Sequence, residues 1–199
     1  IAWGAFKGCS ALENLDLSTS NIENIQSYAF SECTSLSSVK FPSSLRQIYG
    51  NAFSQNSALQ AVTFNDGLDG IGGSAFSNTG LTTVTLPNSL TYLGSSAFSS
   101  CKDLASISIG TGITEIPYNC FSGCNALTSV DLPEHVTSIG GSAYSYCNGL
   151  VSITLPSSIQ AVGASAFANC SNLEEVVIPD NVTTLGTGAF QYDKKLKHV

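Results

Sequence analysis

Residues 150–170 read LVSITLPSSIQAVGASAFANC, a unit of the form L-x-x-I-x-L-P-x-x-I-x-x-V-G-x-x-A-F-x-x-C. The pattern recurs along the whole chain, and its aromatic position returns every 22 to 24 residues. We call these positions the aromatic column; they are Phe6, Phe30, Phe53, Phe76, Phe98, Phe121, Tyr144, Phe167 and Phe190. A fixed period of this length is typical of a solenoid, in which each repeat stacks on the next.

The distribution of rare residues supports this register independently. Eight of the ten Phe lie in the aromatic column, and five of the six Pro directly follow an alternating aliphatic pair. Six of the seven Cys lie three residues after the aromatic column, at Cys9, Cys33, Cys101, Cys124, Cys147 and Cys170; Asn56 and Thr79 replace Cys there. A chance arrangement would not segregate three residue types into three columns.

Each unit predicts one short strand. In Val130-Asp131-Leu132 the apolar residues flank a polar one, which places two side chains inward and one outward. Pro133 ends this strand, at a position where its missing N–H does least harm. Gly follows the last aliphatic residue in five repeats, but Pro117 fills that position once. We therefore interpret this glycine column as serving close packing rather than a positive φ.

A single unit cannot bury its own apolar side, so stacking must supply the core. We predict one domain over residues 1–199: a β-rich, α/β-type right-handed superhelix of about eight repeats of ~23 residues, with a parallel sheet on its concave face. Ile1 and Val199 both fall inside the pattern. We expect an uncapped fragment of a longer array, whose raw ends favour end-to-end association.

The repeat unit resembles that of the BspA-like leucine-rich-repeat proteins, a family of surface proteins. This resemblance covers the whole chain and implies a leucine-rich-repeat solenoid. It also implies a secreted or surface-displayed protein with roles in adhesion and in binding host matrix proteins. The general leucine-rich-repeat pattern has Asn eight residues after its first Leu, and this chain has it only at Asn181. We expect the cysteine column, with Asn56 and Thr79, to satisfy the hydrogen-bonding groups of the interior turn instead.

No catalytic, cofactor or metal site is predicted. A column of parallel thiols does not converge on one point, as zinc requires, so we interpret the cysteines as buried, reduced, small apolar residues with a weak S–H donor. His135 and His198 lie three repeats apart, and no motif places either beside a nucleophile. We expect the protein not to be an enzyme.

Charge and hydropathy exclude two classes of partner. The net charge is −7, with only seven Lys and Arg, which argues against a nucleic acid because such binding requires phosphate neutralisation. No run of about 20 apolar residues is present, so direct membrane insertion of this segment is not expected.

Binding must then use a surface of the stack. The outward residues of the predicted strands form a hydroxyl-rich face, and we predict the partner-binding residues to be Lys40, Thr63, Thr85, Ser108, Asp131 and Thr154. The expected partner is a protein or glycan on a host or neighbouring cell, and the expected location is extracellular or at the cell surface. Two alternatives remain: Ser and Thr are simply favourable strand residues, or the repeats are a spacer that projects another domain.

Overall fold

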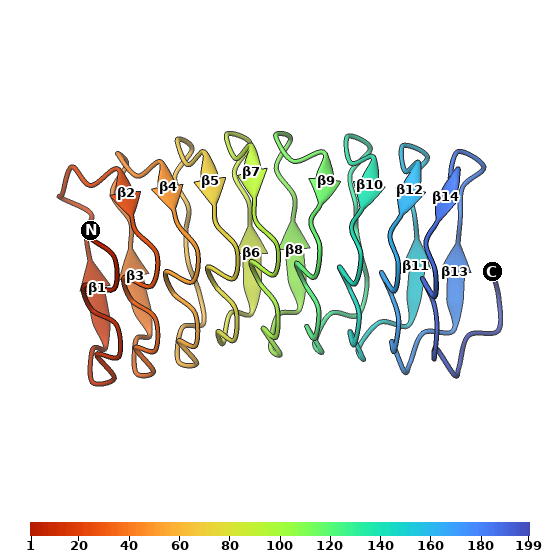
Figure 1. Cartoon of the computed structure of the whole chain (residues 1–199), viewed down its shortest axis with the longest axis horizontal. Helices are drawn as coiled ribbons and strands as arrows, with labels where there is room; N and C mark the ends of the chain where they lie inside the picture. Colours follow the sequence, from red (N-terminus) through yellow and green to blue (C-terminus); the bar gives the residue numbers. More distant parts are fainter.

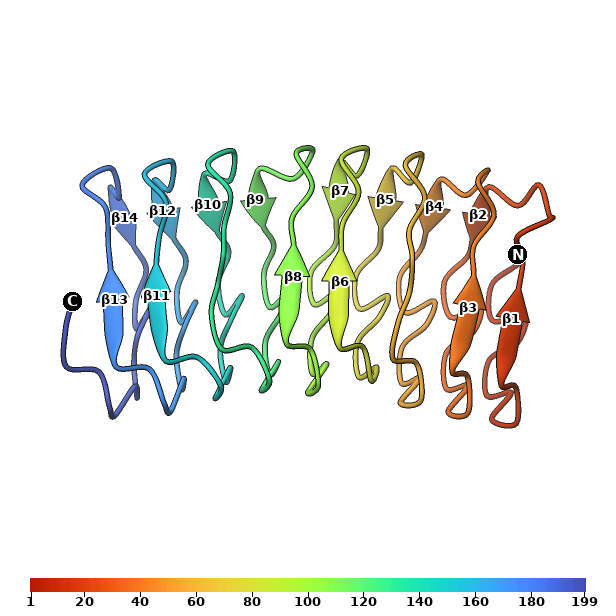
Figure 2. The same ribbon diagram turned by 180° about the vertical axis from the view of Figure 1, so that it is seen from behind.

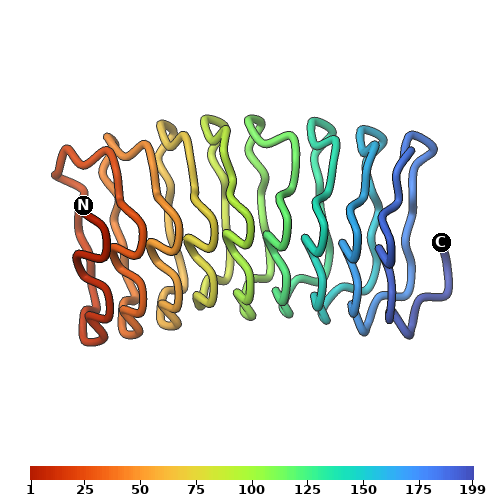
Figure 3. Tube along the Cα trace, in the orientation of Figure 1, coloured from red at the N-terminus to blue at the C-terminus, as the bar shows by residue number.

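The computed structural model describes all 199 residues as one elongated stack of similar coils. Successive coils follow one long axis, and the N- and C-termini lie at opposite ends (Figures 1 and 3). The chain contains fourteen short strands and no helix, so turns and short strands, rather than helices, make up the rest of each coil. It accordingly has no helix of the length and hydropathy that a membrane span requires.

Six of the predicted strands form, and they pair in parallel. Aligned residues sit one repeat apart, as in the pairing of Leu15 with Val39 and of Val84 with Ile107. Viewed from behind in Figure 2, these strands lie side by side along the stack. They are β1 (Asn14–Asp16), β3 (Ser38–Lys40), β6 (Thr83–Thr85), β8 (Ser106–Ser108), β11 (Ser152–Thr154) and β13 (Glu175–Val177). We call the surface that they carry the strand face.

The strand face is not one continuous sheet. It consists of three separate pairs, β1–β3, β6–β8 and β11–β13. Residues 61–64 and 129–132 form no strand and no backbone hydrogen bond to either neighbouring repeat. The prediction of a strand at Val130-Asp131-Leu132 is therefore wrong, and Thr63 and Asp131 lie on these irregular segments.

Bulky interior side chains account for both interruptions. Phe41 and Phe64 occupy a position that holds aliphatic residues in other repeats, and their rings stack 6.0 Å apart, wider than strand spacing. At the second interruption, Tyr144 replaces Phe in the aromatic column and lines a water-sized cavity of about 20 Å³ beside Ile107 and Val130. Both groups thus lie at the segments that make no backbone hydrogen bond to a neighbouring repeat.

A second ladder of two-residue strands, which sequence analysis did not predict, lies on the opposite side of the stack. Its strands are β2 (Asn24–Ile25), β4 (Gln47–Ile48), β5 (Gly70–Ile71), β7 (Tyr92–Leu93), β9 (Glu115–Ile116), β10 (Ser138–Ile139), β12 (Ala161–Val162) and β14 (Thr184–Leu185). Consecutive strands pair in parallel, except that β7 and β9 do not pair. The second ladder is therefore two four-stranded sheets.

The most regular hydrogen bonding lies around the aromatic column. At each of the first eight positions of the aromatic column, the N–H groups of the aromatic residue and of the residues two before and two after it donate to the next repeat, as Asn119, Phe121 and Gly123 do at 2.8–2.9 Å. The two flanking residues have positive φ, near +57° at Asn119 and +74° at Gly123. This geometry recurs in all eight junctions between repeats. We call these five-residue segments the aromatic spine.

The rings of the aromatic column stack at centroid distances of 5.0–5.8 Å. The seven inner rings are buried, and they belong to one hydrophobic cluster that runs the length of the chain. Offset aromatic stacking adds to the free energy that burial alone contributes. The sequence prediction of an axial phenylalanine ladder is confirmed.

The residues of the cysteine column form hydrogen bonds with backbone groups in the interior of each turn. All its thiols except that of Cys9 are buried. Each buried thiol donates to the carbonyl of the aromatic-column residue in the previous repeat, as Cys147 does to Phe121 at 3.2 Å. Asn56 accepts the N–H of Cys33 at 2.9 Å, and Thr79 donates to the carbonyl of its own repeat. The predicted turn-satisfying role of this column is confirmed.

The glycine column serves close packing, as predicted. None of its members has positive φ. A Cβ added to Gly94 would lie 2.3 Å from the backbone nitrogen of Gly73, and one added to Gly163 would lie 2.4 Å from that of Gly141. Glycine therefore lets adjacent turns of the second ladder approach each other.

Candidate functional site

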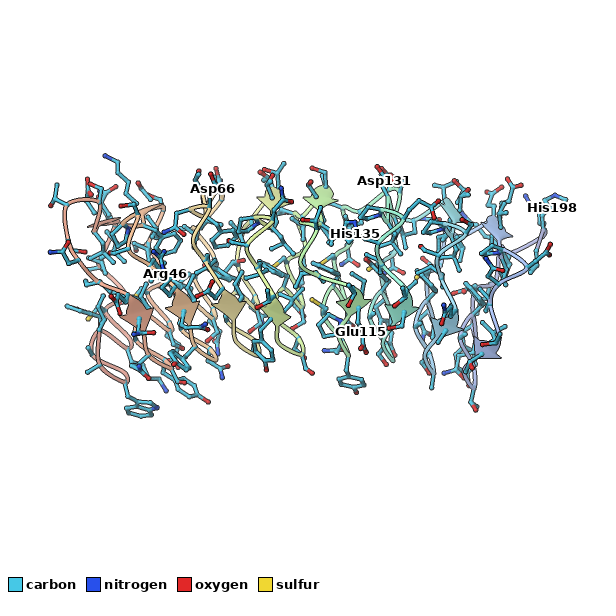
Figure 4. The ribbon with its side chains drawn as sticks, turned by 90° about the horizontal axis from the view of Figure 1, so that it is seen from above. Arg46, Asp66, Glu115, Asp131, His135 and His198 are labelled. Carbon is cyan, nitrogen blue, oxygen red and sulfur yellow. The ribbon has the colours of Figure 1, made fainter.

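All six residues predicted to bind a partner are exposed along the strand face. Lys40, Thr85, Ser108 and Thr154 lie on strands, and Thr63 and Asp131 lie on the two irregular segments. Seen from above in Figure 4, Asp131 lies on one long side of the stack and Glu115 on the other. The two ladders therefore offer two opposite surfaces for binding.

The interruptions of the strand face coincide with grooves. Thr63 and Thr85 line a groove of about 340 Å³ whose floor includes Phe64. Ser108 and Asp131 line a smaller groove of about 170 Å³. Four of the six predicted residues thus border depressions, although sequence analysis predicted only a flat face.

Charge on the strand face is sparse, and part of it is already paired. Nζ of Lys40 lies 3.2 Å from a carboxylate oxygen of Asp16, and both side chains are exposed. The hydroxyl and backbone N–H of Ser18, together with Lys40, lower the pKa of Asp16 to about 2. Lys40 is therefore less available to a partner than a free lysine. Three of the four predicted residues at the grooves, Thr63, Thr85 and Ser108, carry a hydroxyl group.

Burial makes the cysteine thiols poor nucleophiles. Desolvation raises the pKa of Cys147 to about 12, and it raises the pKa values of Cys101, Cys124 and Cys170 in the same way. A thiol attacks as its thiolate, so these groups are inert at neutral pH. The ring of His135 contacts the carbonyl of Gly110 at 3.1 Å, which is an inter-repeat contact.

The second ladder contains a cleft that sequence analysis missed. Between β7 and β9 lies a depression of about 480 Å³, bordered by Tyr92, Tyr118 and Glu115. Both tyrosines are 59% exposed. The signal was present in the sequence, because Pro117 is the one proline in the glycine column.

The missing N–H of Pro117 explains why this cleft forms. At the same position in other repeats the N–H donates to the previous strand, as Gly94 does to Ile71 at 2.8 Å and Gly140 to Ile116 at 2.7 Å. Tyr49 also carries a Cβ there, yet its N–H still donates to Ile25 at 2.9 Å. A side chain is therefore tolerated in this column, whereas proline removes the ladder bond.

Comparisons with known proteins place the repeat in a family. The model of the BspA type leucine-rich repeat region matches residues 1–105 and 69–197, in six copies. No curated protein sequence gives a significant match.

Three solved structures illustrate the similarity. A leucine-rich repeat protein from Bacteroides ovatus is 22% identical with a TM-score of 0.73, over 100% of this chain and 69% of that chain. The leucine-rich repeat protein of T. pallidum is 32% identical with a TM-score of 0.69, over 75% and 70%. A leucine-rich cell surface protein from Faecalibacterium prausnitzii is 26% identical with a TM-score of 0.56, over 94% and 63%. The fold of this chain is thus that of bacterial leucine-rich-repeat proteins.

Proposed function

Because this chain belongs to the BspA-type leucine-rich-repeat family, we propose that it is a non-catalytic scaffold that binds a protein partner through its strand face. One observation carries the proposal: the strand face is an extended, hydroxyl-rich surface with two grooves, and four predicted residues border them. Solenoids characteristically use such an extended surface for binding.

We further propose that the scaffold acts in adhesion outside the cell, either secreted or held at the cell surface. The similar protein from Faecalibacterium prausnitzii is a cell surface protein, which supports this location. The surface chemistry is compatible with it, because the net charge of −7 and the exposed hydroxyl groups favour solubility.

Surface plasmon resonance against immobilised extracellular-matrix proteins, together with adhesion of coated beads to epithelial cells, tests the binding. We expect measurable binding by the wild type and at least tenfold weaker binding by the triple variant Thr85→Lys, Ser108→Lys and Asp131→Lys, which reverses or adds charge at both grooves.

The matched control is the triple variant Gln160→Lys, Thr183→Lys and Thr184→Lys. These positions are also exposed, but Thr184 lies on the second ladder and the other two lie directly beside it. It should bind as the wild type does. Absence of binding by the wild type, or equal losses in both triple variants, would exclude the strand face as the binding surface.

The non-catalytic part of the proposal has its own test. In a Cys9→Ser variant, which lacks the one exposed thiol, serine-directed and cysteine-directed activity probes should label no residue stoichiometrically, since the remaining thiols are buried and have raised pKa values. Stoichiometric labelling of a single residue would contradict it.

A spacer function is the second candidate, and the aromatic spine supports it. Its hydrogen bonds continue through all eight junctions, which favours a stiff rod able to hold another domain away from its anchor. Binding lost in the strand-face variant and retained in its control would favour the scaffold over the spacer.

A further inference from the structure

The cleft between β7 and β9 differs from the strand-face grooves in its chemistry. Its aromatic rings come from Tyr92 and Tyr118, and its only charged residue is Glu115. The remaining polar side chains are the hydroxyls of Thr91, Ser95 and Thr114. The cleft therefore combines apolar ring faces with many hydrogen-bonding groups, and no cation lines it.

The interrupted ladder adds backbone groups to this set. In neighbouring repeats the equivalent carbonyls accept ladder hydrogen bonds, as those of Asp69 and Ile71 do. The carbonyls of Thr91 and Leu93 accept none, because β9 does not pair with β7. Two acceptors that other repeats use internally are thus left for a ligand.

The surrounding structure fixes the walls of the cleft. Behind it the spine continues, with Ser96 donating to Tyr118 at 2.9 Å and Phe98 to Cys120 at 3.0 Å. A Cβ added to Gly141 would lie 3.4 Å from the ring of Tyr118, so this ring rests against the next repeat. The volume of about 480 Å³ lies within the range of about 300–1,000 Å³ that small-molecule sites occupy.

We infer that this cleft binds a neutral saccharide, with the tyrosine rings against its apolar sugar faces and Glu115 and the free carbonyls accepting its hydroxyl protons. An anionic ligand is disfavoured because Glu115 faces the cleft without a neighbouring Lys or Arg. A peptide strand inserted between β7 and β9 is disfavoured, because it needs a gap of about two strand spacings between the repeats. The spine holds these two repeats closer than that, with the ring centroids of Phe98 and Phe121 5.8 Å apart. The inference is independent of the proposed strand-face function, which uses the opposite surface.

Saturation-transfer difference NMR and isothermal titration test the inference on the full chain. The probes are maltohexaose, cellohexaose and mannohexaose, with 3′-sialyllactose as an anionic and tetramethylammonium as a cationic comparison. We expect at least one neutral hexasaccharide to bind, and to perturb the backbone amide shifts of residues 91–95 and 112–118. Sialyllactose and tetramethylammonium should bind at least tenfold more weakly.

Three variants locate the site. Tyr92→Ala and Tyr118→Ala should each weaken binding at least tenfold, and Pro117→Gly should do so by restoring the ladder bond to Leu93. Tyr49→Ala is the matched control, because Tyr49 is exposed at the position equivalent to Pro117 in a repeat whose ladder is intact; it should retain full affinity. Circular dichroism verifies that each variant is folded.

Three results would overturn the inference. The first is that none of the three hexasaccharides binds the wild type. The second is preferential binding of tetramethylammonium or sialyllactose, which would identify a different ligand class. The third is binding that survives loss of both tyrosines, which would place the saccharide elsewhere.

Discussion

The aromatic spine and the strand face are built from the same repeats, yet they differ in continuity. The spine keeps three backbone hydrogen bonds at each of its eight junctions, which makes 24 in all. On the strand face, residues 61–64 and 129–132 make no backbone hydrogen bond to a neighbouring repeat. The turns of the aromatic spine therefore hold the stack together more consistently than the segments of the strand face.

This difference separates stability from binding. The spine places small Ala residues and stacked rings at its centre, so consecutive backbones approach closely and uniformly. The strand face tolerates bulky interior groups such as Phe41 and Phe64, whose rings stack 6.0 Å apart. Grooves lie at both of its interruptions, and the ring of Tyr144 from the spine lies beneath the second one. The same argument applies to Pro117, which opens the cleft of the second ladder while the spine behind it stays intact.

Truncating phenylalanines on the two sides should give the largest contrast. Phe121→Ala removes a fully buried ring from the spine and should lower the free energy of unfolding by about 3–5 kcal/mol, through lost burial and a cavity. Phe64→Ala removes a partly buried ring from an interrupted segment and should cost about 1–2 kcal/mol. Urea unfolding followed by circular dichroism measures both, and equal losses would remove the distinction between the two sides.

A matched serine pair tests the backbone geometry of the spine. Ser142 has a φ of +55°, which a β-branched residue adopts only with strain, so Ser142→Val should destabilise the protein by about 1–3 kcal/mol. Ser152 is exposed on β11, where valine is a favourable strand residue, so Ser152→Val should change stability by less than about 0.5 kcal/mol. Thermal unfolding of both variants measures this, with Ser142→Gly as the unstrained control. A Ser142→Val variant as stable as the wild type would contradict the positive-φ assignment.

Asp193, which occupies the last position of the cysteine column, should make the stability of the protein depend on pH. Asp193 accepts the N–H of Cys170 at 2.7 Å, and burial raises its pKa from 3.8 to about 6. The folded state therefore binds more protons than the unfolded state between pH 4 and 6, and stability should fall as the pH rises through this range.

Asp193→Asn should abolish this dependence, because Asn56 makes the same bond to Cys33 at the equivalent position without a charge. We expect the variant to exceed the wild type by about 1 kcal/mol at pH 7, well below the full value of the shift, because water at the end of the stack screens the charge. Urea unfolding at pH 4 and pH 7 measures the difference. A wild type that gains stability relative to the variant on going to pH 7 would contradict the raised pKa.

The smallest effect is expected on the exposed strand face itself. Thr85→Ser changes one methyl group at an exposed position of β6 and should alter the free energy of unfolding by less than about 0.5 kcal/mol. A loss above 1 kcal/mol would show that the strand face contributes more to stability than its hydrogen bonding indicates.

The sequence predicted the features that recur at a fixed spacing in most repeats. The aromatic column, the cysteine column and the glycine column each depend on one predominant residue type at one spacing, and the structure confirms the role of each. The donor role of the thiols followed from their interior position, because a buried S–H requires an acceptor.

The features that the sequence did not predict depend on contacts between repeats. Strands of two residues, such as β4 and β9, are too short to show an alternating pattern. The positive φ of Ser142 gives no distinct signal, since serine is also an ordinary turn residue. The interruptions of the strand face depend on the volume of interior side chains that meet across neighbouring repeats, such as Phe41 and Phe64. The cleft of the second ladder depends on the single missing N–H at Pro117.

Native-state hydrogen exchange tests the central claim most directly, because it reports the protection of each backbone amide. We predict that the amides of Phe53, Phe76, Phe98 and Phe121 exchange only through global unfolding. The amides of residues 61–64 and 129–132 should exchange orders of magnitude faster under the same conditions. Strand-face amides at 129–132 as protected as that of Phe121 would contradict the claim that the spine, and not the strand face, holds the stack together.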